Sequence, residues 1–169
     1  MAGSQNSAAQ PVPPIESVAE LLCQAHAMEE EAANRYRDLA ESLEGVNAKL
    51  AEVFRRMAVI EAKHVARVDE LAEGLELPGF ETMTVAGWQP GEGPETLDRS
   101  KVDPDSTQAQ ALAAMLELEE TAVAYFTRIA ETTSDSEVQR LAGEMAEEER
   151  QHVALLNGWL AEVGGAPAP

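Results

Sequence analysis

Apolar side chains recur every three or four residues in four separate segments of this chain, a spacing typical of helices that bury one face. The segments are residues 17–43, 47–73, 107–131 and 134–163. Aromatic and β-branched residues are too few and too scattered for a sheet protein. The sequence therefore predicts an all-α fold of four helices.

The expected helix ends have their own signals. Three starts have the spacing of a capping box, in which side chains three residues apart cap the first turn: Ser17 with Glu20, Thr107 with Gln110, and Ser134 with Glu137. Gly74 is expected to end the second helix, because glycine takes a positive φ at little cost. The connector at about residues 74–106 holds four prolines and should not be helical. We expect one domain at residues 17–163, with flexible ends at 1–16 and 164–169.

The turns place carboxylates at matching heights. Gly45 lies sixteen residues from both Glu29 and Glu61, and Ser134 lies fifteen residues from both Glu119 and Glu149. In an antiparallel helical hairpin, equal path lengths from the turn put two side chains at the same level. Each predicted hairpin therefore brings together one pair of glutamates.

The two hairpins also resemble each other. The stretches "AMEEEAANRYRDLAE" and "ELEETAVAYFTRIAE" align with Glu29 on Glu119, at an offset of ninety residues. The second helix aligns with the fourth at an offset of eighty-eight, which places Glu61 on Glu149 and His64 on His152. A duplicated helical hairpin is the simplest interpretation.

Each apolar stripe has a glutamate near its middle, and the second and fourth add a histidine three residues later. An unpaired carboxylate in an apolar core costs several kcal/mol, and four of them would exceed a typical domain stability of about 5–15 kcal/mol. Two divalent cations would balance four carboxylates, and neutral imidazoles would complete the ligand set. A Glu from two helices with Glu-x-x-His from two others is the di-iron or di-manganese arrangement of four-helix bundles. The predicted metal ligands are Glu29, Glu61, His64, Glu119, Glu149 and His152.

Other interpretations apply to single residues. Glu29 and Glu119 lie in acidic runs that are ordinarily solvent-exposed, and only their place in the stripes selects them over Glu30, Glu31 and Glu120. Tyr36 lies two turns after Glu29, and we weigh simple packing against a hydrogen-bonding or redox role beside the metals. His26 is expected to be partly buried or near the ligands rather than a ligand. Cys23 is expected in the core, and Trp88 and Trp159 are expected to anchor packing.

The charge and the ends of the sequence limit the class of partner. Lys and Arg number 12 against 31 Asp and Glu, a net charge of −19, which argues against nucleic-acid or anionic-membrane partners. The first residues lack a secretory signal and no uncharged apolar stretch could span a bilayer, so a soluble, cytoplasmic protein is expected. The single cysteine excludes an internal disulfide and a Cys-x-x-Cys metal site.

At these residues the chain resembles the rubrerythrin and bacterioferritin branches of the ferritin-like superfamily. "AHAMEEEAANRY" is similar to the first-helix signature of rubrerythrins, and the two Glu-x-x-His helices extend the match over about residues 17–163. The resemblance implies a ferritin-like bundle in which a long connector lets the second and third helices run parallel. It implies Glu29 with His64 on one metal, Glu119 with His152 on the other, Glu61 and Glu149 as bridges, and Tyr36 as the tyrosine beside the site.

The chain departs from those families at several points. Ala122 stands where rubrerythrins usually have a further glutamate, and Ala62 stands where bacterioferritins have a haem-binding methionine, so haem is not expected. A rubredoxin domain would need four cysteines, so any electron donor is expected to be another protein. The chain ends soon after the fourth helix, which argues against a cage of twenty-four subunits, and a homodimer is the default expectation.

The expected function is a di-iron oxidoreductase, a peroxidase or ferroxidase that binds two Fe ions and reacts with hydrogen peroxide or dioxygen. Iron storage or delivery is an alternative and would be recognised by a large assembly. A di-manganese catalase-like enzyme is another and would be recognised by metal analysis. A helical interaction protein with a vestigial site would show no stabilisation by metal.

Overall fold

The computed structural model describes residues 15–78 and 102–165, and within these ranges the chain forms helices and no strands. The helices are α1 (Val18–Leu43), α2 (Ala48–Leu71), α3 (Gln108–Thr132) and α4 (Ser136–Gly165). The predicted all-α class and four-helix count are therefore confirmed. Trp88, most of the expected connector and most of both expected flexible ends lie outside the described residues.

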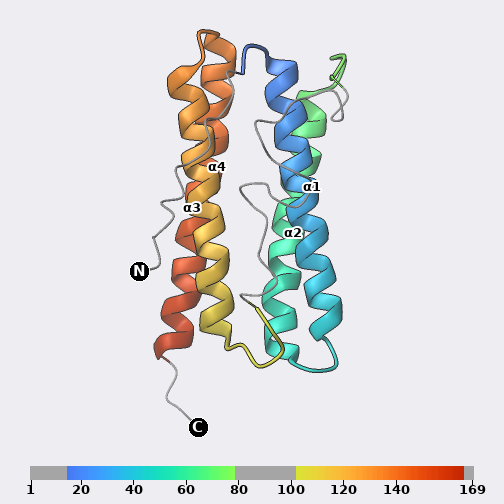
Figure 1. The fold of residues 1–169 in the computed structure, drawn as a ribbon, viewed down its shortest axis with the longest axis vertical. Helices are drawn as coiled ribbons and strands as arrows, with labels where there is room; N and C mark the ends of the chain where they lie inside the picture. Colours follow the sequence, from blue (N-terminus) through green and yellow to red (C-terminus); the bar gives the residue numbers. More distant parts are fainter. Residues whose placement is uncertain (1–14, 79–101, 166–169) are drawn as a thin grey trace, which may run out of the picture.

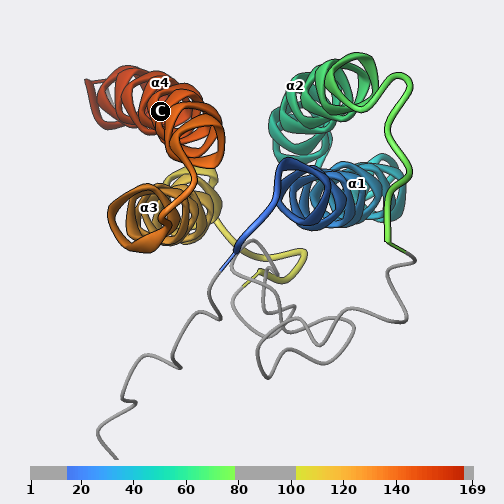
Figure 2. The ribbon, with the colours of Figure 1, turned by 90° about the horizontal axis from the view of Figure 1, so that it is seen from above.

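The helices form two antiparallel hairpins, α1 with α2 and α3 with α4 (Figure 1). In that view α1 and α4 run downward whereas α2 and α3 run upward, so the second and third helices are parallel, as the length of the connector predicted. Seen from above, the four helices stand at the corners of a bundle, with α2 beside α4 and α1 beside α3 (Figure 2). This is the arrangement of a ferritin-like four-helix bundle.

Two of the three predicted capping boxes differ from expectation. The box of Thr107 and Gln110 is complete. The Ser17 hydroxyl accepts from the Glu20 amide, but the Glu20 carboxylate accepts from Glu16 N instead of Ser17 N.

Ser134 is not the cap of α4, so that prediction was wrong. Asp135 Oδ1 accepts from the amides of Glu137 and Val138, at 2.9 Å each. Asp135 directly precedes the helix, and its short carboxylate reaches both amides from that position. The helix also runs on to Gly165, past its expected end at residue 163.

Gly74 has a φ of 82°, as predicted for the residue that follows the second helix. The helix itself ends at Leu71, with Ala72 as its C-cap. In the described ranges no helix combines the length and the apolar character that a bilayer span requires.

The core is divided into two apolar clusters, one near each end of the bundle, and each draws on all four helices. The lower core, at the end where α1 turns into α2, includes Leu39, Phe54, Leu112 and Leu156. The upper core, at the opposite end, includes Leu22, Val68, Phe126 and Leu141. Ile15, just before α1, is also buried in the upper core. The residues between the two cores include buried polar side chains, and these define the candidate site.

Candidate metal centre

All six predicted ligands meet in the layer between the lower and upper cores. Each helix contributes to this layer: Glu29 from α1, Glu61 and His64 from α2, Glu119 from α3, and Glu149 and His152 from α4. The four glutamates are only 1–2% exposed and His152 is 6% exposed, whereas His64 is half-buried. The helical stripes therefore carry carboxylates into the interior at one level.

The two imidazoles connect the four carboxylates. His64 Nδ1 lies 3.6 Å from Glu29 Oε1 and 3.7 Å from Glu149 Oε1. His152 Nδ1 lies 3.0 Å from Glu119 Oε2, 3.1 Å from Glu149 Oε2 and 3.8 Å from Glu61 Oε1. The two rings are 4.6 Å apart between centroids. Glu29 thus pairs with His64 and Glu119 with His152, while Glu149 contacts both histidines.

These side chains form three overlapping groups whose ligand atoms lie within 4.8 Å of one another. The groups are Glu61 with His64 and His152; Glu29 with His64 and Glu149; and Glu119 with Glu149 and His152. His64, His152 and Glu149 each belong to two groups. Shared members are what two adjacent cation positions require, so the cluster fits a binuclear metal site.

Several buried oxygens in the layer lack a hydrogen-bond donor. Both carboxylate oxygens of Glu61, both of Glu149 and Oε2 of Glu29 have no hydrogen-bond partner. The contacts of Glu149 with the imidazoles are therefore close charge contacts without directed hydrogen bonds. Buried polar atoms are nearly always satisfied in folded proteins, and a metal ion is a common reason for an exception. The donor set of carboxylates and imidazoles fits iron or manganese.

Burial and mutual repulsion make some of these carboxylates hard to ionise. Burial raises the pKa of Glu61 well above its ordinary value, and the neighbouring charges of Glu119 and Glu29 raise it further. Burial also raises the pKa of Glu29. The pKa of Glu119 rises to about 7 through burial, although its hydrogen bond with His152 opposes the change.

For Glu149 and the two histidines, contacts between opposite charges outweigh burial and determine the direction in which the pKa shifts. Burial alone would raise the pKa of Glu149, but contacts with His152 and His64 outweigh it and lower the pKa to about 2. Burial lowers the pKa of the histidines, but their carboxylate neighbours outweigh it and raise the pKa of His64 to about 10 and of His152 to about 11. Without metal, protons on the imidazoles therefore neutralise part of the buried negative charge.

Tyr36 reaches this layer from α1. Its hydroxyl donates to Glu119 Oε1 at 3.5 Å, and its ring stacks on Phe54 with 6.1 Å between centroids. The side chain is buried, at 1% exposure. Tyr36 therefore joins the carboxylate layer to the lower core.

Other residues that the sequence analysis singled out lie outside the three ligand groups. His26 Nε2 lies 3.2 Å from Asp69 Oδ1, in a polar contact between α1 and α2 outside the three groups. Ala122 is fully buried one turn after Glu119. Cys23 is buried and its thiol donates to the carbonyl oxygen of Pro78. Trp159 is buried beneath the guanidinium of Arg56, 3.8 Å from the ring centroid.

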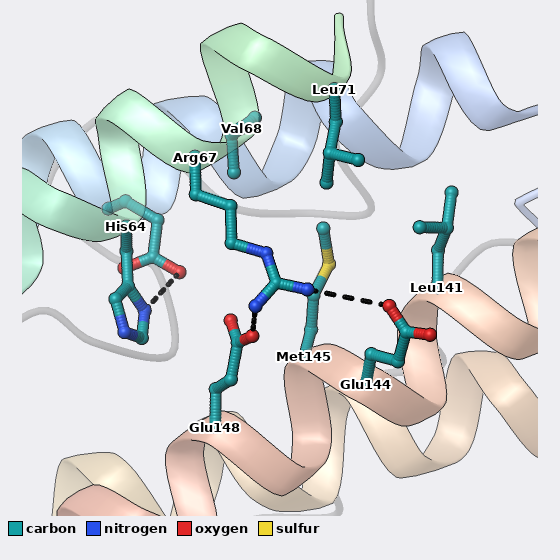
Figure 3. Close-up of a pocket in the computed structure, with 9 residues that line it drawn as sticks. His64, Arg67, Val68, Leu71, Leu141, Glu144, Met145 and Glu148 are labelled. Carbon is teal, nitrogen blue, oxygen red and sulfur yellow. Dashed lines mark hydrogen bonds and ion pairs between the residues drawn. The ribbon is translucent and has the colours of Figure 1, made fainter.

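Sequence reasoning missed the charged residues just outside His64. Arg67, on α2, forms ion pairs with Glu144 and Glu148 of α4 (Figure 3). Arg67 is one turn after His64, and the two glutamates are one turn apart on α4. That spacing was visible in the sequence, but it acquires meaning only once α2 is known to lie beside α4.

Comparisons with known proteins identify the family of this chain. The family profile described as rubrerythrin matches residues 20–85. The crystal structure of an uncharacterised conserved protein from Magnetospirillum magnetotacticum MS-1 is 31% identical in sequence and superposes with a TM-score of 0.68. That match covers 90% of this chain and 97% of the other. This chain belongs to the rubrerythrin-like branch of the ferritin-like superfamily. A search of curated proteins gave no match for this rubrerythrin-like chain.

Proposed function

We propose that this rubrerythrin-like protein is a di-iron oxidoreductase, a peroxidase or ferroxidase that reacts with hydrogen peroxide or dioxygen. The observation that carries the proposal is the layer of four buried glutamates and two histidines, in which five carboxylate oxygens lack a hydrogen-bond donor. Such a layer is costly for an apolar bundle unless cations occupy it.

The charge and type of the ligands support iron. Four carboxylates balance two divalent cations, and the hard oxygen donors favour the higher oxidation state. Bound Fe(II) would supply the electrons that reduce peroxide or dioxygen. Glu29 with His64 would hold one ion and Glu119 with His152 the other, and Glu61 and Glu149 would supply the remaining carboxylate ligands.

The surrounding residues would prepare this site for the reaction. Tyr36 donates to Glu119 and so orients that carboxylate. The lower and upper cores enclose the layer along the bundle axis, and this keeps bulk water away from the ligands. Because the fold gathers the four carboxylates in one buried layer, little rearrangement would be needed for metal binding.

An anaerobic Fe(II) titration tests the proposal. Two Fe(II) per chain are expected at the end point, followed by ferric absorbance after rapid mixing with peroxide in one aliquot and dioxygen in another. The relative rates identify the preferred oxidant. An end point near zero would contradict the proposal.

Two adjacent glutamates of α3 provide matched variants. Glu119→Gln removes a buried ligand and is expected to lower the end point and abolish rapid oxidation. Glu120→Gln makes the same chemical change at an exposed position and is expected to leave both unchanged. Equal behaviour of the two variants would show that the layer is not the metal site.

A further inference from the structure

A narrow pocket opens between α2 and α4 and reaches the metal centre (Figure 3). Its inner end is formed by Glu29 and His64, and its walls include Val68 of α2 and Leu141 of α4. Glu29 is 2% exposed, and its Oε2 atom has no hydrogen-bond partner. The pocket therefore leads from the surface to an unsatisfied carboxylate oxygen.

Arg67 lies across this pocket. Its guanidinium pairs with Glu148 through Nη1, and its Nη2 atom lies 3.4 Å from Glu144 Oε2. Exposure falls along the pocket, from 45% for the Arg67 side chain to 20% for Glu148 and 15% for His64. The arginine is thus at the outer side, and the centre is behind it.

We propose that this pocket is the route by which divalent cations enter the centre and that Arg67, held by Glu144 and Glu148, is its gate. The inference rests on the proposed function, because an entry route needs a metal centre to serve. With Arg67 in place the volume of the pocket is about 10 Å³, which is at the lower limit for holding a single water molecule. A hydrated divalent cation is larger than this and enters only when the arginine moves.

The charges along the pocket explain why the route suits a cation. When Arg67 turns outward, Glu148 at the entrance loses its positive partner, and Glu144 keeps only Arg140, whose Nη1 atom lies 2.5 Å from Glu144 Oε1. Glu29 supplies a third carboxylate at the inner end. Successive carboxylates attract a cation and offer it oxygen ligands as it loses water. The bidentate fork of arginine closes the route because it binds both glutamates at once.

A gate and a simple electrostatic effect give different kinetics. A gate changes the rates of uptake and release by the same factor, so the dissociation constant of the metal stays the same. Removing a nearby positive charge instead strengthens cation binding, so uptake becomes faster and release does not. The two rates together therefore separate the two explanations.

Anaerobic stopped-flow mixing with Co(II) measures uptake through the visible absorbance of the bound ion, and excess EDTA measures release. Arg67→Lys keeps the charge but loses the fork, and Arg67→Gln loses both. Both variants are expected to accelerate uptake by about three- to tenfold, the range for loss of two partly exposed ion pairs, and Arg67→Lys is expected to accelerate release by the same factor. For Arg67→Lys the dissociation constant is expected to stay within about twofold of the wild-type value.

Arg55→Gln is the matched control. Arg55 is also on α2, is 44% exposed and pairs with Glu44 and Glu52, but it does not line this pocket. It is expected to load at the wild-type rate. Wild-type rates in both Arg67 variants, or faster uptake without faster release in Arg67→Lys, would overturn the gate. If every variant binds two ions at one common rate, the gate alone is refuted. If the wild type binds no metal, the proposed function and the gate are refuted together.

Discussion

Glu61 is the residue at which stability and function conflict most clearly. It is 1% exposed, neither of its carboxylate oxygens has a hydrogen-bond partner, and burial and neighbouring charges raise its pKa. A side chain selected only for stability would not carry this charge. A metal ligand has to carry it.

Glu61→Gln is therefore expected to have opposite effects on the metal-free and metal-bound protein. Without metal, removing an unfavourable buried acid should raise the free energy of unfolding by about 1 kcal/mol, or the melting temperature by about 2–4 °C. With metal, the wild type should gain about 2.7 kcal/mol for each bound ion at a free concentration of one hundred times the dissociation constant, and the variant should lose most of that gain. Thermal unfolding in EDTA and in Mn(II) measures both effects.

Glu70→Gln provides the comparison on the same helix, because Glu70 is exposed. It is expected to change neither melting temperature by more than about 1 °C. Destabilisation of the metal-free protein by Glu61→Gln, together with an intact response to Mn(II), would show that Glu61 is a structural residue.

Tyr36 tests the role of the hydroxyl beside Glu119. Tyr36→Phe removes a hydrogen bond to a carboxylate, an interaction worth about 1.5–3 kcal/mol, and should slow iron oxidation about tenfold or more. The ring remains, so two ions should still bind. Single-turnover oxidation after an Fe(II) titration measures both quantities.

Tyr125→Phe is the control for this substitution. The Tyr125 hydroxyl donates to Gln24, and its ring belongs to the upper core. The same loss of a buried hydroxyl away from the carboxylates is expected to leave the oxidation rate unchanged. If both variants oxidise iron at the wild-type rate, Tyr36 has a packing role only.

The sequence carried the information needed to select the six layer residues, but not their outer partners. A charged residue in the middle of an apolar stripe must be buried with its helix, whatever the details of packing. An arginine or glutamate on a polar face has no such constraint. The contact of Arg67 with Glu148 depends on the rotation of α2 and α4, which periodicity along one helix does not fix.

At the level of the helices, the start of α4 depends on one side chain. Asp135 accepts from two amides of the first turn and also places negative charge at the helix N-terminus. Asp135→Ala is expected to lower the free energy of unfolding by about 1 kcal/mol, within a range of 0.5–2. Urea denaturation of the metal-free protein measures the change.

Ser134→Ala is the matching control, because Ser134 is exposed and the capping bonds belong to its neighbour. It is expected to change the free energy of unfolding by less than about 0.5 kcal/mol. A larger loss in Ser134→Ala than in Asp135→Ala would restore the serine as the cap.

Helix ends were predictable where a strong local signal had no competitor. Thr107 with Gln110 and the turn at Gly74 are of this kind. At the start of α4, Ser134 and Asp135 are adjacent and both residue types are good caps. The residue that caps the helix is the one that directly precedes its first turn, and the dihedral angles of the turn determine where that turn begins.

At the scale of the whole molecule, two hairpins meet around a polar layer. α1 packs mainly against α2 and α3 mainly against α4. The centre instead joins the hairpins, since Glu61 and His64 of the first hairpin form one ligand group with His152 of the second. The duplicated sequence and the long connector predicted this topology, because equal hairpins joined by a crossover place like residues opposite each other. The side-by-side position of α2 and α4, on which the proposed gate depends, required the structure.

Because this layer holds protons when it holds no metal, metal binding is expected to depend steeply on pH. His64 and His152, with pKa values raised to about 10 and 11, are protonated at neutral pH, but metal ligation requires neutral imidazoles. The imidazoles should therefore release about two protons per chain on binding, and buried carboxylates with raised pKa values add to this number. Apparent affinity should rise by about a hundredfold or more for each pH unit between about 6 and 8.

Calorimetric titration with Mn(II) in buffers of different ionisation enthalpy counts the protons released. His26→Gln should release the same number as the wild type, because His26 pairs with Asp69 outside the three ligand groups. Affinity that is independent of pH over this range would mean that the imidazoles are already neutral in the metal-free protein. The carboxylates would then be held together without the charge compensation from protonated histidines that the geometry of the layer implies.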